Sequence, residues 1–169
     1  ARLRDVAAGL DGTAYLLDEG TRIVHAYGPQ GAYLFSFGGR GRGRGKFERP
    51  AGIAVGPAGV VCVSDERNQT IQFFDPQGRF LTSVGGRGAG RGQFKEPQGI
   101  GATADGLVFV ADRGNRRVQV FNCVVPGREA PAARLEKPVR IAVFDFKNNN
   151  PQAQGRGYGE TISEMFITA

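Results

Sequence analysis

The sequence predicts an all-β fold assembled from consecutive four-stranded antiparallel units. Three observations predict it: an ungapped internal repeat of 47 residues, short runs of Val, Ile, Leu and Phe without a helical period, and turn residues between those runs. Glycine accounts for 27 of the 169 residues, yet hydrophobic residues still make up 40%. This composition favours a glycine-rich folded domain over a disordered or collagen-like chain.

The repeat is clearest in the middle of the chain. Residues 47–53 read FERPAGI and return as FKEPQGI at 94–100. The same offset aligns an aspartate and an asparagine in the two copies, as Asp65 with Asp112 and Asn68 with Asn115. Run backwards, it aligns Asp18 with Asp65, so three copies are expected.

The second copy shows how each unit is built. Its strands are expected at 52–55, 60–64, 70–74 and 80–84, joined by GPAG at 56–59, DERN at 65–68 and DPQG at 75–78. Gly supplies a positive φ, Pro fixes φ, and Asp or Asn can bond to the backbone two residues on, so each joint reverses the chain. A four-stranded meander of this length is the unit of a β-propeller blade.

The last third of the chain departs from the repeat. Residues 126–133 (PGREAPAA) leave the third unit without an expected outer strand, and 135–143, which repeats the Pro-x-x-Ile-Ala-Val signature, is expected to begin a fourth copy. Residues 1–145 are therefore assigned to blades, and the polar segment 146–169 to a linker or disordered tail.

Propellers typically close with 4 to 8 blades, so this chain is expected to be an incomplete propeller. The missing part would come from further blades of a longer propeller or from a second copy of the chain.

Three motifs resemble those of a known family. They are PAGIAV at 50–55, the segment 63–75 with Asp65 and Asn68, and DRGNRRVQVF at 112–121. They resemble NHL repeats, and the resemblance covers about residues 1–145. It implies an NHL-type β-propeller in which Asp65 and Asn68 are structural turn residues. Such propellers often form the C-terminal domain of tripartite-motif (TRIM-NHL) ubiquitin ligases, so the resemblance also implies a non-catalytic module that recruits RNA or protein targets.

Positive charge is expected to gather on one face. The chain carries 22 Lys and Arg against 16 Asp and Glu, a net charge of +6. In a meander, the turn between the second and third strands and the connection between blades emerge at the same end. The arginines predicted to bind RNA or a partner there are Arg113, Arg116, Arg117, Arg67, Arg40, Arg42 and Arg44. Guanidinium groups bind two phosphate oxygens at once, so the expected partner is RNA or an acidic protein surface.

The run GGRGRGRGK at 38–46 is the sharpest local feature. It resembles RGG-type RNA-contacting segments, in which arginines track phosphates and stack on bases. Alternatively, its glycines serve only to turn the chain between blades, because a similar run follows at 85–93. Two broader alternatives stay open: the charges form only a solvated rim, or the propeller is a protein–protein scaffold with no nucleic acid role.

Neither an enzyme site nor a metal or cofactor site is expected. His25 is the only histidine, and Cys62 and Cys123 lack metal-ligand spacing. A metal-dependent lyase would need ligands from additional blades. Cys62 is expected to be a buried strand residue, and two unpaired thiols suit the cytoplasm, with a single disulfide as the alternative. No apolar run approaches the ~20 residues of a membrane helix, so no membrane partner is expected.

Overall fold

The computed structural model describes residues 2–124 and 140–146. These residues form three four-stranded antiparallel sheets, which we call the first, second and third blades. The first blade contains β1 (Leu3–Ala8), β2 (Ala14–Asp18), β3 (Ile23–Tyr27) and β4 (Tyr33–Gly38). The second contains β5 (Pro50–Val55), β6 (Val61–Asp65), β7 (Thr70–Phe74) and β8 (Phe80–Gly85). The third contains β9 (Pro97–Ala102), β10 (Leu107–Asp112), β11 (Arg117–Val124) and β12 (Arg140–Phe146).

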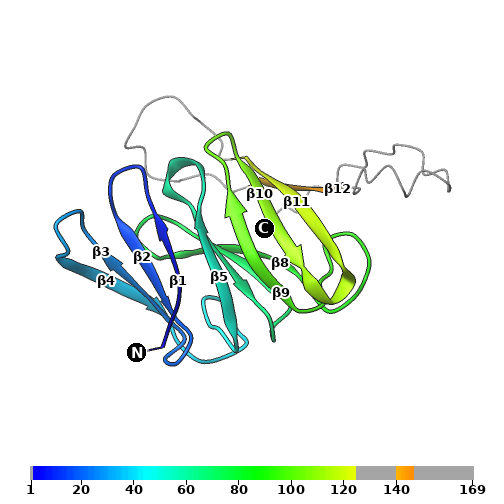
Figure 1. The fold of residues 1–169 in the computed structure, drawn as a ribbon, viewed down its shortest axis with the longest axis horizontal. Helices are drawn as coiled ribbons and strands as arrows, with labels where there is room; N and C mark the ends of the chain where they lie inside the picture. Colours follow the sequence, from blue (N-terminus) through cyan, green and yellow to red (C-terminus); the bar gives the residue numbers. More distant parts are fainter. Residues whose placement is uncertain (1, 125–139, 147–169) are drawn as a thin grey trace.

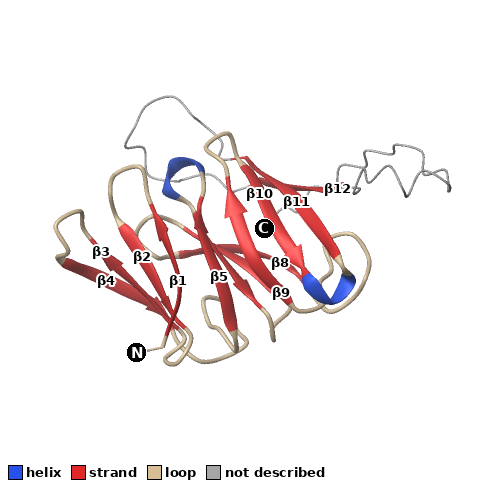
Figure 2. Ribbon diagram, in the orientation of Figure 1, coloured by secondary structure: helices blue, strands red, loops and turns tan. Residues whose placement is uncertain are grey.

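The blades lie side by side with their first strands together. β1, β5 and β9 are neighbours at the centre, and the other strands of each sheet follow outward in chain order. Two short 3-10 turns, η1 (Pro57–Gly59) and η2 (Arg113–Asn115), lie at opposite ends of the blades (Figure 2). The predicted fold class, an incomplete propeller of four-stranded blades, is confirmed, and the strands of the second blade agree with their predicted ranges within two residues.

The outer strand of the third blade differs from the prediction. The sequence pattern assigned 135–143 to the first strand of a fourth copy, but Arg140–Phe146 pairs antiparallel with β11 and completes the third blade (Figure 1). The free edge of β11 offers unpaired backbone groups to any suitable strand. The Pro-x-x-Ile-Ala-Val signature predicts a strand but not the sheet edge that the strand joins. The repeat alone therefore assigned this strand to the wrong sheet. Residues 135–139 and 147–169 lie outside the described residues.

The second blade is covered on both faces, which makes its first three strands, β5, β6 and β7, almost wholly buried. Side chains alternate along β6: Val61 and Val63 join a core cluster with the first blade, while Cys62 joins a cluster with the third. Phe47 and Phe94 are fully buried at equivalent positions of these two clusters. The recurrence of Phe every 47 residues therefore reflects packing between blades, as expected for bulky apolar residues.

Buried aspartates organise the turns at one end of each blade. Asp65 accepts hydrogen bonds from the main-chain N–H groups of Glu48 (2.7 Å), Arg49 (3.0 Å) and Asn68 (2.9 Å). The equivalent Asp18 is bonded by main-chain N–H groups of which that of Arg2 contributes most, and these bonds lower the pKa of its carboxyl group. The predicted role of these aspartates as turn residues is confirmed.

Candidate nucleic-acid interface

The basic face consists of the β2–β3, β6–β7 and β10–β11 turns together with the connections between blades, residues 39–49 and 86–96. The Gly-Arg run lies in the first of these connections and is held by main-chain bonds. Gly39 N–H donates to Arg22 O (2.7 Å), and Phe47 N–H donates to Gly39 O (2.8 Å). Gly38 and Gly39 have φ values of +108° and +98°, where only glycine is comfortable. These glycines turn the chain, and the loop presents its arginines from a fixed backbone.

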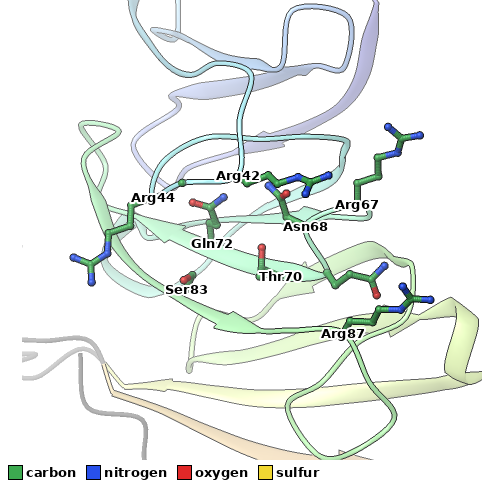
Figure 3. A pocket seen from close by; sticks show the side chains of 10 residues that line it. Arg42, Arg44, Arg67, Asn68, Thr70, Gln72, Ser83 and Arg87 are labelled. Atoms are coloured by element: carbon green, nitrogen blue, oxygen red, sulfur yellow. The ribbon is translucent and has the colours of Figure 1, made fainter.

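An open cavity of about 620 Å³ lies on the basic face of the second blade, bounded by this loop, the β6–β7 turn and the strands β7 and β8. Its lining is polar and consists of Arg42, Gly43, Arg44, Arg67, Asn68, Gln69, Thr70, Gln72, Ser83 and Arg87. Figure 3 shows the side chains of Thr70, Gln72 and Ser83 among the four arginines. We call this cavity the second-blade pocket.

The loop side of the pocket is anchored by Gln72. Its Oε1 accepts from Gly45 N–H (2.8 Å) and its Nε2 donates to Lys46 O (2.6 Å). Asn68 Nδ2 adds a bond to Gly41 O (3.1 Å). These bonds tie the Gly-Arg loop to β7 and to the β6–β7 turn, so the geometry of the pocket is built into the blade.

The arginines of the pocket are well exposed. The side chains of Arg42 and Arg67 are 84% and 68% exposed, and each lies just under 4 Å from the Glu48 carboxylate (3.9 and 3.8 Å). Arg44 and Arg87 are also exposed. Ion pairs of such length between exposed groups contribute little, so these guanidinium groups remain available to an anion. Four positive charges line the pocket, with one carboxylate beside two of them.

The remaining predicted binding residues lie elsewhere. Arg40 is exposed at the start of the Gly-Arg loop, outside the pocket lining. Arg113 and Arg116 are exposed on the β10–β11 turn, where Arg113 pairs with Glu96 at 3.0 Å. Arg117 is half-buried, and its guanidinium group donates within the chain to Asp112 and to two carbonyl groups. The structure thus brings together Arg42, Arg44 and Arg67 and separates them from the arginines of the third blade.

The sequence analysis did not single out the polar floor of the pocket. Thr70, Gln72 and Ser83 stand on strands, where polar residues give little signal in a single sequence. One signal was present in the repeat itself: Thr70 stands where the next copy has Arg117.

The groups considered for catalysis or metal binding are dispersed. Within residues 2–124 and 140–146, no three His, Cys, Asp or Glu side chains are grouped so as to hold a metal ion. Cys62 and Cys123 are buried free thiols, which decides against the disulfide. In the same part of the chain, no helix has both the length and the apolar character to cross a membrane.

Comparison with known proteins identifies the repeat. The family model named NHL repeat matches residues 47–74 and 94–121, which run from the buried Phe47 and Phe94 through β7 and most of β11. The chain contains two NHL repeats. The two matches start 47 residues apart, the spacing found within the sequence, and the first blade has the same strand order. A comparison with curated protein sequences found no match.

Solved structures similar to this NHL-repeat chain share its fold at low sequence identity. A streptogramin B lyase has 14% identity and a TM-score of 0.55, over 88% of this chain and 42% of the lyase. Virginiamycin B lyase from Staphylococcus aureus has 12% identity and a TM-score of 0.53, over 85% of this chain and 48% of the enzyme. Hsv2 from Kluyvelomyces marxianus has 11% identity and a TM-score of 0.53, over 72% and 43%. The chain spans less than half the length of each, and these likenesses show the fold alone.

Proposed function

We propose that this NHL-repeat chain is a non-catalytic interaction module whose basic face binds the phosphate backbone of single-stranded RNA. The observation that carries the proposal is the second-blade pocket, where four arginines surround a polar cavity. An arginine can bind two phosphate oxygens with its planar fork and can also stack on a base, which suits an unpaired strand.

The lining of the pocket favours RNA over an apolar protein partner. Protein interfaces are usually anchored by buried aromatic or aliphatic side chains. None of the large hydrophobic side chains that are exposed among the described residues lines the pocket: Leu3, Val6, Leu10, Tyr33, Leu34 and Val118. In a ubiquitin ligase of the TRIM-NHL kind, such a module would recruit the target, and the same basic face would then select an RNA or RNA-bound protein.

Fluorescence anisotropy of a labelled single-stranded RNA, measured over a salt series, tests the proposal. If four phosphates are neutralised, the affinity should fall by about 50-fold between about 50 and 200 mM salt. The triple variant R42Q/R44Q/R67Q should lose most of the binding, because three of the four arginines of the pocket are gone. No binding by the folded wild type at low salt would contradict the proposal and favour a protein-docking scaffold.

A matched control separates the pocket from net charge. Gln30, Gln77 and Ala104 are exposed on turns at the opposite end of the blades. The variant Q30E/Q77E/A104E lowers the net charge by the same three units as the arginine variant. It should bind RNA within about threefold of the wild type, since its changes lie about one strand length away, farther than the screening length of about 10 Å at 0.1 M salt. Equal losses in the two triple variants would show that only net charge matters.

A further inference from the structure

Two consecutive blades of this chain place different residues at one position of the repeat. Thr70 begins β7, and Arg117, 47 residues later, begins β11. Each is paired across the turn with the buried aspartate of its own blade, Asp65 or Asp112. The two positions are therefore structurally equivalent, and their side chains extend into equivalent spaces between the turn and the connecting loop.

In the third blade this space is filled. Arg117 Nε donates to Asp112 Oδ2 (2.8 Å), and Nη2 donates to Gly90 O (2.7 Å) and Gln93 O (2.9 Å). The guanidinium group thus closes the gap between β11 and the 86–96 loop from inside the chain. In the second blade, the counterpart of Gly90 is Gly43, which instead lines the open second-blade pocket together with Thr70.

The surrounding framework is the same in both blades. Gln72 and its counterpart Gln119 anchor their loops alike: Gly45 N–H donates to Gln72 Oε1 at 2.8 Å, and Gly92 N–H donates to Gln119 Oε1 at 3.0 Å. The loops are therefore held in equivalent positions. The second-blade pocket exists because a short threonine stands where the next blade has an arginine.

The arginines at the mouth of the space also differ between the two blades. The second blade has Arg42 and Arg67 there, and the offset of 47 places Ala89 and Gly114 at the equivalent positions of the third blade. Arg44 keeps an arginine counterpart, Arg91. The third blade thus has an arginine inside the space and lacks two of those around it, whereas the second blade keeps the space open among its arginines. An arginine inside is a built-in occupant, whereas arginines around a cavity attract an anionic occupant from solution.

We infer that the second-blade pocket is a subsite for one nucleotide of the RNA, an inference that rests on the proposed function. Its volume of about 620 Å³ lies within the usual range of small-ligand pockets, about 300–1,000 Å³. The phosphate lies on the side of the pocket where Arg42, Arg67 and Arg87 stand, opposite Arg44 (Figure 3). The ribose occupies the space left by Thr70, where the hydroxyl groups of Thr70 and Ser83 can bond to its 2′-hydroxyl. The third blade offers no such subsite, because Arg117 fills it.

The variant T70R tests this inference against simple charge attraction. The new arginine should take the place that Arg117 takes in the third blade and fill the pocket. Affinity for single-stranded RNA should fall at least tenfold although the net charge rises by one. The control A89R adds the same charge to the same face at an exposed site outside the pocket, and it should bind RNA as well as the wild type or better.

The outcomes separate the two proposals. If the wild type binds RNA and T70R binds as tightly, the nucleotide subsite is wrong while the RNA-binding face stands. If the folded wild type does not bind, the proposed function itself is wrong. Should T70R fail to fold, S83R fills the same pocket from an exposed position on β8 and makes the same prediction.

Competition identifies what the pocket holds. AMP should displace labelled RNA from the wild type at concentrations at which inorganic phosphate does not, because the sugar adds contacts to those of the phosphate. Equal competition by the two compounds would overturn the nucleotide assignment, since it would leave a site for phosphate alone.

Discussion

Asn68 joins the turn of the second blade to the loop that carries the pocket arginines. Its side-chain Nδ2 donates to Asp65 Oδ2 at 2.9 Å and to Gly41 O at 3.1 Å. The equivalent Asn115 makes the same two bonds in the third blade, to Asp112 Oδ2 (2.9 Å) and to Gly88 O (2.8 Å). The recurring Asp and Asn of the repeat therefore hold each connecting loop against its blade, and they fix the backbone from which the arginines project.

Replacing the buried carboxylate should destabilise the protein strongly. Asp65→Ala removes a buried carboxylate and leaves the main-chain N–H groups of Glu48, Arg49 and Asn68 without their acceptor, so the free energy of unfolding should fall by about 3 kcal/mol. Asn68→Ala removes two bonds at a partly exposed site and should cost about 1 kcal/mol. Urea denaturation measures both. A change below about 0.5 kcal/mol for Asp65→Ala would contradict the role assigned to the carboxylate.

The packing of adjacent blades can be tested at Gly52. A Cβ added there would lie 2.7 Å from Gln98 O of the neighbouring strand β9, too close to be tolerated without a backbone shift. Gly52→Ala should therefore lower the free energy of unfolding by about 2 kcal/mol. Gly101 on β9 has no atom within 4 Å of such a Cβ, so Gly101→Ala is the control and should change stability by less than about 0.5 kcal/mol. Equal effects would show that the blades are not packed as described.

The sequence was sufficient for the repeating part of the fold because each strand and turn is specified locally and appears more than once. The turn residues around Asp65, the buried Phe47 and the four strands of the second blade all follow from local pattern and repetition. The partner of Arg140–Phe146 did not follow, because an edge is chosen by tertiary pairing. The pocket was predicted in part, because three of its four arginines, Arg42, Arg44 and Arg67, were among the expected binding residues. Residue spacing does not reveal whether a guanidinium group is exposed or, like that of Arg117, hydrogen-bonded within the chain.

Arg117 should behave as a structural residue. Its guanidinium group bonds to a fully buried carboxylate and to two loop carbonyl groups, so Arg117→Ala should lower the free energy of unfolding by about 2 kcal/mol. At a temperature where the Arg117→Ala variant is folded, its affinity for RNA should differ from that of the wild type by less than threefold. Arg67→Ala should show the reverse: little loss of stability and at least fivefold weaker RNA binding. RNA binding that depends on Arg117 more than on Arg67 would place the site on the third blade.

The two cysteines should be unreactive in the folded protein. Burial raises the pKa of the Cys123 thiol to about 11, and burial with the nearby Cys123 raises that of Cys62 well above its ordinary value. A thiol-specific reagent at about pH 8 should react slowly with the native protein and rapidly after addition of denaturant.

The same shifts determine how stability depends on pH. The folded state favours the neutral Cys123 thiol. The contribution of this thiol to the free energy of unfolding is therefore complete below about pH 9 and is lost as the pH rises through about 11. Fast reaction of the native thiols, or stability that rises across this interval, would contradict their burial.

The position of the RNA site is the central claim, and backbone amide chemical shifts measured during a titration with single-stranded RNA test it most directly. The account predicts that the largest shifts occur at residues 42–44, 67–70, 72, 83 and 87, which line the second-blade pocket, with small changes at the opposite turns 28–32 and 75–79. Shifts concentrated on those opposite turns, or none at an RNA excess and low salt, would contradict it.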